Sequence, residues 1–126
     1  MVPAGRMIVE KRRVEGLTLL TVEGVIKLGE SARFFADALK RVLAEEGSHV
    51  LVDLSKINYM DSTGIGELVG YLTRFQEVKR KLILVQPSEQ IRKLLRVAHL
   101  DELFPIFDNL EDAVAGGDTA VPGPNS

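Results

Sequence analysis

Two hydroxyl side chains and a carboxylate stand together in the segment 60–70, which reads MDSTGIGELVG. Ser62 and Thr63 follow Asp61 where a buried strand is expected to give way to a helix. Free backbone N–H groups and the positive end of the helix dipole favour an anion at such a position. A phosphoryl group on either hydroxyl would add about −1.5 to −2 charge at pH 7 beside Asp61 and change any docking surface there. The segment is therefore a candidate modification site.

The same residues also have a purely structural interpretation. Asp61 or Ser62 can serve as the N-cap of the helix by accepting a hydrogen bond from a backbone N–H of its first turn, a contribution of about 1 kcal/mol. Capping is the commoner use of short polar side chains at helix starts. The residues alone leave capping and modification both open.

Helix capping does not explain the three glycines of the segment. Gly64, Gly66 and Gly70 are expected in the first two turns of the helix, where a glycine costs up to about 1 kcal/mol relative to alanine. Gly66 and Gly70 are four positions apart and share one face. That face offers bare backbone, which suits close approach by another element. The approaching element could equally be the protein's own sheet or a partner protein.

The hydrophobic pattern of the remaining chain predicts the elements that hold this segment. Alternating or continuous apolar runs predict strands, and apolar residues at spacings of three and four predict amphipathic helices. A short reversal at Glu15 and Gly16 joins the first two strands, Ser88 is a candidate helix cap, and Pro105 places the last strand at a sheet edge. The expected strands are 7–14, 17–23, 49–55, 82–85 and 104–107, and the expected helices are 31–46, 61–81, 87–98 and 110–115.

This element order, β-β-α-β-α-β-α-β-α, predicts an α/β domain with a mixed four- to five-stranded sheet covered by helices. The domain is expected to span 7–115, and the Gly/Pro-rich remainder, 116–126, is expected to be a disordered tail. A receiver domain has a similar length, and Asp53 could pass for its phosphoaccepting residue. However, a receiver domain lacks an opening hairpin and carries a lysine after its last strand, whereas Asp108 and Asn109 follow Phe107 here.

Composition excludes several classes of protein. The chain has 126 residues and no cysteine, which rules out disulfides, thiol nucleophiles and cysteine-based metal sites. Sixteen basic against eighteen acidic residues give a net charge of −2, which argues against nucleic-acid binding. His49 and His99 have no metal-ligand spacing, and no nucleotide-binding loop is present. We therefore expect no cofactor and no metal. The chain has no run long enough to span a membrane and no N-terminal signal, so we expect a cytoplasmic protein without direct membrane insertion.

Two segments resemble the STAS family, whose founding members are bacterial anti-sigma-factor antagonists. They read LVDLSKINYMDSTGIGELVGYL and KLILVQPSEQIRKLLRVAHLDELFPIFDNLEDAV. The most specific part, 61–66, matches the family's Asp-Ser-Ser/Thr-Gly-hydrophobic-Gly signature. The resemblance spans about 7–114 and implies the STAS fold without a catalytic centre, so we expect no enzymatic activity.

The resemblance also implies a function. Unphosphorylated antagonists bind an anti-sigma factor that is also a serine-protein kinase, which frees a sigma factor, whereas the phosphorylated form does not bind and a PP2C-type phosphatase resets it. The phosphorylated hydroxyl precedes the signature's first glycine, which makes Thr63 the expected acceptor and Ser62 the alternative. The residues expected to contact the partner are Asp61, Ser62, Thr63, Gly64, Ile65, Gly66, Lys27 and Ser55.

One departure from the family concerns the loop after the second strand. Many antagonists carry an Asp there in a Gly-x-Leu-Asp pattern, whereas Lys27 reverses the charge in this chain. That loop tends to lie near the phosphorylation loop in the family, so Lys27 could steer a different partner or pair with a phosphate. Asp53 and Ser55 are expected at the end of the preceding strand, where they would flank the same edge, although Asp53 is equally suited to a turn.

A second function is compatible with the same resemblance. A STAS module can be a constitutive subunit of a lipid-transport ATPase complex or of a signalling scaffold, in which Thr63 is a cap and a contact residue and is never phosphorylated. The sequence leaves a monomer and a homodimer open.

Overall fold

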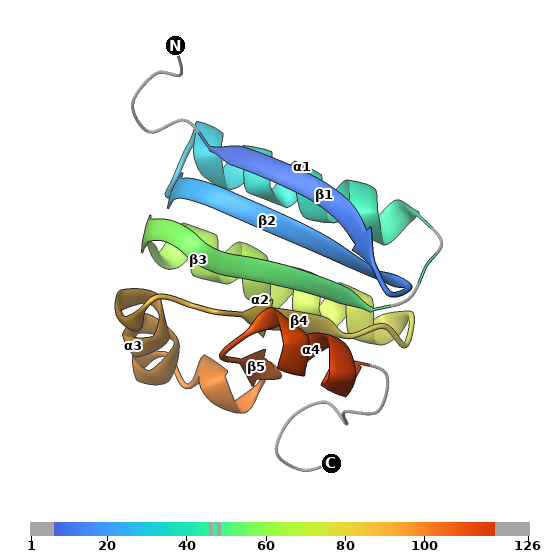
Figure 1. The fold of residues 1–126 in the computed structure, drawn as a ribbon. Coiled ribbons are helices and arrows are strands. Elements are labelled where there is room, and N and C mark those ends of the chain that lie inside the picture. The colour runs from blue at the N-terminus through green and yellow to red at the C-terminus, as the bar shows by residue number, and fades with distance from the viewer. Residues whose placement is uncertain (1–6, 46, 48, 118–126) are drawn as a thin grey trace.

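The computed structural model describes residues 7–45, 47 and 49–117 (Figure 1). Five strands form one sheet in the spatial order β1-β2-β3-β4-β5. β1 pairs antiparallel with β2, and every later pair is parallel, so the predicted mixed sheet is confirmed. The strands are β1 Ile8–Val14, β2 Leu17–Ile26, β3 Val50–Met60, β4 Leu82–Val85 and β5 Ile106–Phe107.

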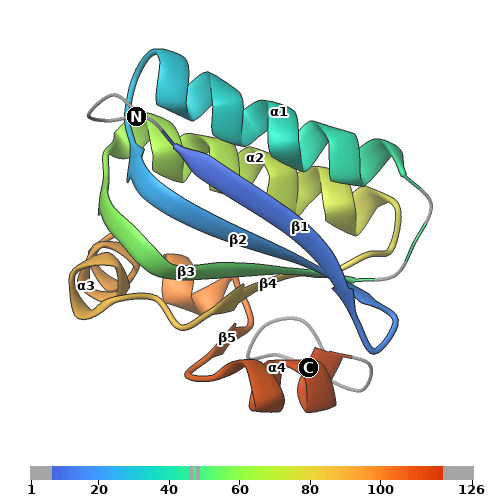
Figure 2. The same cartoon turned by 45° about the horizontal axis from the view of Figure 1, so that its top comes forward.

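Helices lie on both sides of the sheet. Figure 2 shows α1 and α2 side by side on one face and α4 on the other, with α3 beside the later part of β3. The helices are α1 Glu30–Ala44, α2 Ser62–Glu77, α3 Glu89–Val97 and α4 Leu110–Gly117, and a short 3-10 helix spans Leu100–Glu102. The sequence pattern did not predict the 3-10 helix.

Two apolar layers hold these elements together. The larger lies mainly between the sheet and helices α1 and α2, where Phe35 and Phe75 are fully buried, and it extends to Ile91 and Leu95 of α3. The smaller lies under α4, where Ile83 of the sheet packs with Ala113. The side chains of a covered parallel sheet are apolar on both faces, which explains why β4, with four buried residues, was predicted with its observed bounds.

The hairpin between β1 and β2 sets the register of the first strand. Glu15 and Gly16 both have positive φ angles, 48° and 84°. Two consecutive residues of this kind make the tight turn whose twist suits a two-residue hairpin. Val14 therefore lies opposite Leu17, and Ile8 lies opposite Glu23.

β3 is longer than the sequence pattern predicted. The expected end at Ser55 is wrong, because the strand continues to Met60. Its register with β2 shifts twice, first between the Asp53 and Lys56 positions and again before Tyr59. Each extra residue in a strand changes which face the following side chains point to. The strand's later buried residues, Leu54, Ile57 and Met60, are therefore spaced by three instead of two.

Other boundaries also differ from the predicted ones. α1 spans Glu30–Ala44 instead of 31–46, and α2 ends at Glu77 instead of 81. Ser88 caps α3 as predicted, since its hydroxyl accepts a hydrogen bond from the Ile91 backbone N–H at 3.3 Å. β5 begins only after Pro105.

The last helix is longer than predicted. Gly116 and Gly117, expected in the tail, belong to α4. A Cβ on Gly116 would lie 2.7 Å from the Phe107 ring, so the helix packs closely on β5. The rest of the predicted disordered tail, 118–126, lies outside the described residues.

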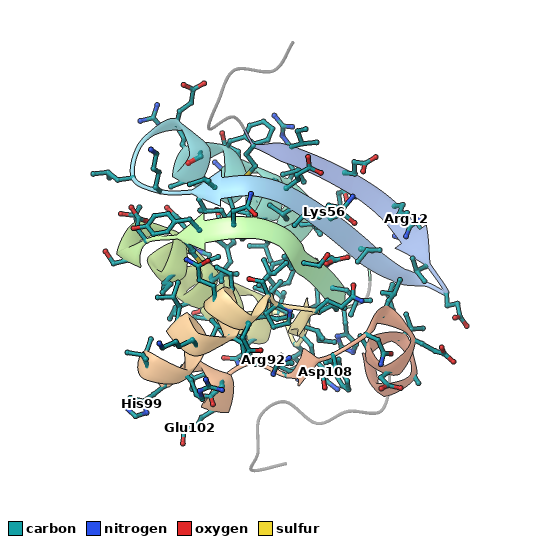
Figure 3. The ribbon with its side chains drawn as sticks, turned by 60° about the vertical axis from the view of Figure 1, so that its left-hand side comes forward. Arg12, Lys56, Arg92, His99, Glu102 and Asp108 are labelled. Atoms are coloured by element: carbon teal, nitrogen blue, oxygen red, sulfur yellow. The ribbon has the colours of Figure 1, made fainter. Side chains whose placement is uncertain are left out.

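One part of the sheet has no helix over it. On the side opposite α1 and α2, helices α3 and α4 lie near the β4 and β5 side of the sheet (Figure 3). Leu17 and Leu19 at the start of β2 are buried in the cluster that contains Ala113 of α4. No helix stands in front of the rest of β1 and β2, and Arg12 of β1 and Lys56 of β3 are seen on this open side. Lys56 forms a 3.9 Å ion pair there with Glu23 of β2. The residues of this face are mostly polar, which suits a sheet surface open to solvent.

Candidate functional site

The carboxylate of Asp61 connects the start of α2 to the loop before α1. Its Oδ1 accepts hydrogen bonds from the backbone N–H groups of Thr63 at 3.0 Å and Gly64 at 3.1 Å. Its Oδ2 accepts a hydrogen bond from the Leu28 N–H at 2.9 Å, across 33 positions of the chain. Its own backbone N–H donates to the Ile26 carbonyl at 3.1 Å. Asp61 is thus the N-cap of α2, as one of the two interpretations of the sequence predicted, and Ser62 is the first residue of the helix.

These hydrogen bonds favour the ionised form of the carboxylate. The pKa of Asp61 is lowered, chiefly by the hydrogen bond from the Leu28 N–H, with further contributions from the N–H groups of Gly64 and Thr63. The negative charge also stands at the positive end of the α2 dipole. Asp61 therefore supplies a fixed negative charge directly before the two hydroxyl residues.

The two hydroxyl groups are available for chemistry. Ser62 is exposed and Thr63 is half-buried. The Thr63 backbone N–H is used by the cap, but within the described part of the chain neither hydroxyl group makes a hydrogen bond. A phosphoryl group on either oxygen would therefore not need to displace an internal partner.

The glycines of the segment fall into two kinds. Gly64 is buried, and a Cβ built on it would lie 2.7 Å from Ile26 Cγ2 and 2.7 Å from Met60 Cγ. Gly64 therefore lets the start of α2 pack on the ends of β2 and β3. Gly66 and Gly70 are exposed, and a Cβ on either would meet nothing within 4 Å among the described residues. The protein's own sheet is thus not the element that approaches them.

The structure brings Lys27 and Ile65 to the same region. The backbone of Lys27 is fixed, because its N–H donates to the Ser31 hydroxyl at 3.0 Å and its carbonyl accepts from that hydroxyl at 3.2 Å. Its side chain is exposed, and the next residue, Leu28, contacts Asp61. Ile65 is half-buried and packs against the main core.

Ser55 and Asp53 do not join this region. They lie in the middle of β3, and the five strand residues 56–60 separate Ser55 from Asp61, so that six steps along the chain span about 20 Å. The prediction that both flank the signature is therefore wrong. The Asp53 carboxylate accepts a hydrogen bond from the Ser55 N–H at 2.9 Å, where the register shift leaves that amide without its regular place in the ladder. Asp53 thus has the local turn-type role that was the alternative.

Leu28 is a residue of this region that the sequence did not single out. Its side chain is 77% exposed, the largest exposed fraction among the large apolar residues described. Its N–H holds the Asp61 carboxylate. No local pattern signals a hydrogen bond between residues so far apart in sequence, although an apolar residue in a polar loop is a hint of a contact surface.

Other kinds of site were sought in the described ranges. These ranges contain no group of three or more His, Asp or Glu side chains that could hold a metal ion. Over the same residues, each helix is too short or too polar to cross a membrane. His49, which was given no role, accepts a hydrogen bond on Nδ1 from the Lys81 N–H at 3.0 Å.

The sequence and the fold both match known proteins. A family model of the STAS domain matches residues 9–113. The anti-sigma-B factor antagonist of Staphylococcus epidermidis is 33% identical over 87 residues, which cover 66% of this chain and 81% of that protein. The crystal structure of an anti-sigma factor antagonist from Mycobacterium paratuberculosis matches with a TM-score of 0.80 at 20% identity, over 94% of this chain and 99% of that one. SpoIIAA of Bacillus in its phosphorylated form matches with a TM-score of 0.67 at 15% identity, over 86% and 97%.

Two glycine substitutions should have opposite effects on stability. Gly64→Ala places a methyl group against Ile26 and Met60 and should lower the free energy of unfolding by about 1 to 3 kcal/mol. Gly66→Ala meets open space and should raise it by about 0.5 to 1 kcal/mol through helix propensity. Urea denaturation of both variants measures the two changes. A loss of stability in both would mean that the backbone around Gly66 is also tightly constrained.

The lowered pKa of Asp61 predicts a pH-dependent stability. Because the folded pKa lies below the unfolded one, the charge of Asp61 stabilises the fold above the unfolded pKa, and this contribution is lost as pH falls through the folded pKa. The stability advantage of the natural protein over Asp61→Asn should thus be constant near neutral pH and shrink below about pH 4. Urea denaturation between pH 7 and pH 3 measures it. Asp37→Asn is the control, because it removes the same charge from α1 without removing a hydrogen bond to the backbone. A similar pH trend in this variant would contradict the attribution of the pH dependence to the Asp61 hydrogen bonds.

Proposed function

The chain belongs to the STAS domain family, and on that premise we propose that it is an anti-sigma-factor antagonist controlled by phosphorylation of Thr63. In this role it is a binding protein. The unphosphorylated form sequesters an anti-sigma factor that is also a serine-protein kinase, and a sigma factor is released in the cytoplasm. The named functions of the Staphylococcus epidermidis and Mycobacterium paratuberculosis proteins support the general role.

The observation that carries the proposal is the combination of free hydroxyl groups and bare helix backbone at one end of α2. Thr63 stands one residue after the Asp61 cap with no internal hydrogen bond to its hydroxyl among the described residues. Gly66 and Gly70 leave the adjacent helix surface open to a neighbour. A partner's backbone can therefore approach α2 closely just where the charge would change.

Phosphorylation of Thr63 would act on binding without unfolding the helix. A phosphate at a helix N-terminus is favoured by the dipole. The N–H groups of Thr63 and Gly64 are already used by the Asp61 cap, so the phosphate would leave the cap in place. The same phosphate, together with the ionised Asp61, would have to lose its hydration in a close-packed interface, which is costly without a paired cation. The match to SpoIIAA in its phosphorylated form supports a switch that keeps the fold.

Lys27 and Leu28 determine which chemical groups a partner must present to this surface. Both lie in the loop that Asp61 holds against α2, and both side chains are exposed. An apolar side chain that is 77% exposed beside a lysine suits a partner surface with an apolar pocket and a nearby acidic group. This loop would set which anti-sigma factor is bound, and a PP2C-type phosphatase would restore the binding form.

The modification itself is the first test. Purified protein is incubated with a lysate of its source organism and ATP, and the added phosphate is located by intact and peptide mass spectrometry. We expect phosphate on Thr63, none on Thr63→Ala, and unchanged modification of Ser62→Ala. An unmodified chain, under conditions that phosphorylate a known antagonist, would favour the constitutive-subunit function instead, which co-purification with transporter subunits would support.

Binding to the cognate anti-sigma kinase is the second test, measured by calorimetry. Thr63→Asp should weaken binding at least about tenfold, a change of about 1.4 kcal/mol. Gly66→Ala should also weaken it, although it leaves the fold at least as stable. Lys93→Ala, at an exposed position of α3 outside the proposed docking surface, is the control and should bind normally. Equal affinity of all forms would contradict the switch.

A further inference from the structure

The outer edge of β1 is a second candidate binding surface. In the described residues β1 pairs with β2 and with no other strand. Its outward backbone N–H and C=O groups can therefore pair with an added strand, as in β-strand addition to exposed sheet edges. This edge is separated from β3 and the signature by β2.

A groove runs beside this edge, between β1 and α1. It has a volume of about 220 Å³, and two basic and two acidic side chains stand among its lining residues. The apolar part of the lining is made by Val9 of β1, Leu20 of β2 and Phe34, Ala38 and Val42 of α1, and the charged part by Lys11, Arg41, Asp37 and Glu45. Phe34 is 46% exposed. Side chains of a strand alternate between its two faces. Every second side chain of a strand added to β1 would therefore point towards this groove.

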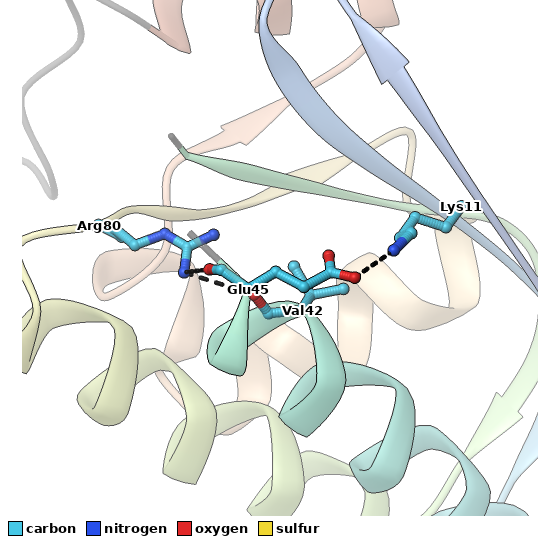
Figure 4. Close-up of polar contacts among 4 residues, drawn as sticks. All are labelled: Lys11, Val42, Glu45 and Arg80. Carbon is cyan, nitrogen blue, oxygen red and sulfur yellow. Dashed lines mark hydrogen bonds and ion pairs between the residues drawn. The ribbon is translucent and has the colours of Figure 1, made fainter. Parts of the chain in front are cut away.

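One end of the groove is fixed by charged contacts. Lys11 of β1 forms a 2.6 Å ion pair with Glu45, the residue after α1 (Figure 4). From the other side, Arg80 Nη1 donates to the carbonyls of Val42 at 3.4 Å, Leu43 at 3.3 Å and Glu45 at 3.1 Å. The end of α1 is thereby held, so the spacing of α1 and β1 is set before anything binds.

The edge is basic, although the whole chain is acidic. β1 carries Lys11, Arg12 and Arg13 against one acidic residue, Glu10, while the chain has a net charge of −2. All four side chains are exposed. Lys11 is already paired with Glu45, so Arg12 and Arg13 are the charges that a partner would meet. Opposite charges that face each other across two strands stabilise their pairing. The charge of β1 therefore favours an acidic strand as its neighbour.

A second copy of the chain meets this requirement less well than an acidic partner strand does. A two-fold antiparallel pairing of β1 with itself places one residue opposite its own copy. In the registers with the longest overlap that residue is Glu10, Lys11 or Arg12. Each of these places two like charges opposite each other, and only the Lys11 register offsets this with two Glu10–Arg12 pairs, whereas an acidic partner strand has no like-charge pair opposite the arginines.

We propose that the β1 edge binds an extended acidic segment of a partner protein, which adds a sixth strand to the sheet and directs apolar side chains into the β1–α1 groove. The surface is independent of Thr63, so this binding does not rest on the phosphorylation switch.

A synthetic peptide tests the proposal. The sequence Val-Glu-Glu-Val-Thr-Val-Thr, paired antiparallel, places glutamates opposite Arg13 and Arg12 and valines opposite Lys11 and Val9. We expect saturable binding by fluorescence anisotropy and slower hydrogen exchange of the β1 amides. A peptide with lysines in place of the glutamates should bind at least tenfold more weakly. No binding of the glutamate peptide at 1 mM would overturn the proposal.

Variants of the protein test separately how the charge of β1 and the apolar groove contribute to peptide binding. Arg12→Glu/Arg13→Glu should reverse the preference between the two peptides, whereas Lys93→Glu/Arg96→Glu, an equal charge change on α3, should not. Phe34→Ala should weaken binding at least threefold, and Leu103→Ala, at a similarly exposed position elsewhere, should not. Thr63→Asp should leave peptide affinity unchanged, so this proposal and the phosphorylation switch fail separately.

Two results would show that another explanation is correct. Two forms of the glutamate peptide are N-methylated on alternate backbone nitrogens, one on the odd-numbered and one on the even-numbered residues. Their affinities should differ, because only one of the two patterns removes the N–H donors that face β1. Equal affinity of both would reduce the interaction to simple charge attraction and overturn strand addition. Sedimentation measures whether the protein forms a dimer. A dimer whose amount changes in the Arg12→Glu/Arg13→Glu variant would mean that a second copy occupies the β1 edge, and this would also overturn the proposal.

Discussion

The carboxylate of Asp61 is the interaction on which the arrangement of the signature region depends. Its two oxygens accept three backbone N–H groups, two from the start of α2 and one from Leu28. The ends of β2 and β3, the loop before α1 and the first turn of α2 therefore meet at one side chain. A neutral side chain of the same shape would hold them less firmly, because hydrogen bonds to an ionised acceptor are roughly twice as strong as those between neutral groups.

The contrast between the glycines separates folding from recognition. Gly64 is required by the protein's own packing, since Ile26 and Met60 leave no room for a Cβ. Gly66 and Gly70 carry a cost in helix propensity and gain no internal contact among the described residues. Residues that cost stability without an internal compensation are often found at functional surfaces. Two neighbouring turns of one helix thus serve different purposes.

The sequence predicted the order of elements well because each one carries its own local signal. β4 is a continuous apolar run, Ser88 caps its helix, and the hairpin turn is made by Glu15 and Gly16. β3 was predicted too short, because its register shifts break the two-residue period on which strand prediction depends. Of the candidate site, the Asp61 cap was predictable, whereas the Leu28 contact and the position of Ser55 are tertiary features that no short segment encodes.

The hairpin turn has a consequence far from itself. With Val14 opposite Leu17, the odd-numbered residues Val9 and Lys11 line the groove beside α1. Deleting one residue of the turn would shift β1 by one position against β2 and exchange its two faces. Val9 would then lie on the open side of the sheet, and Glu10 would point into the groove. The register of β1 is therefore set by Glu15 and Gly16, two residues with positive φ angles that belong to neither binding surface.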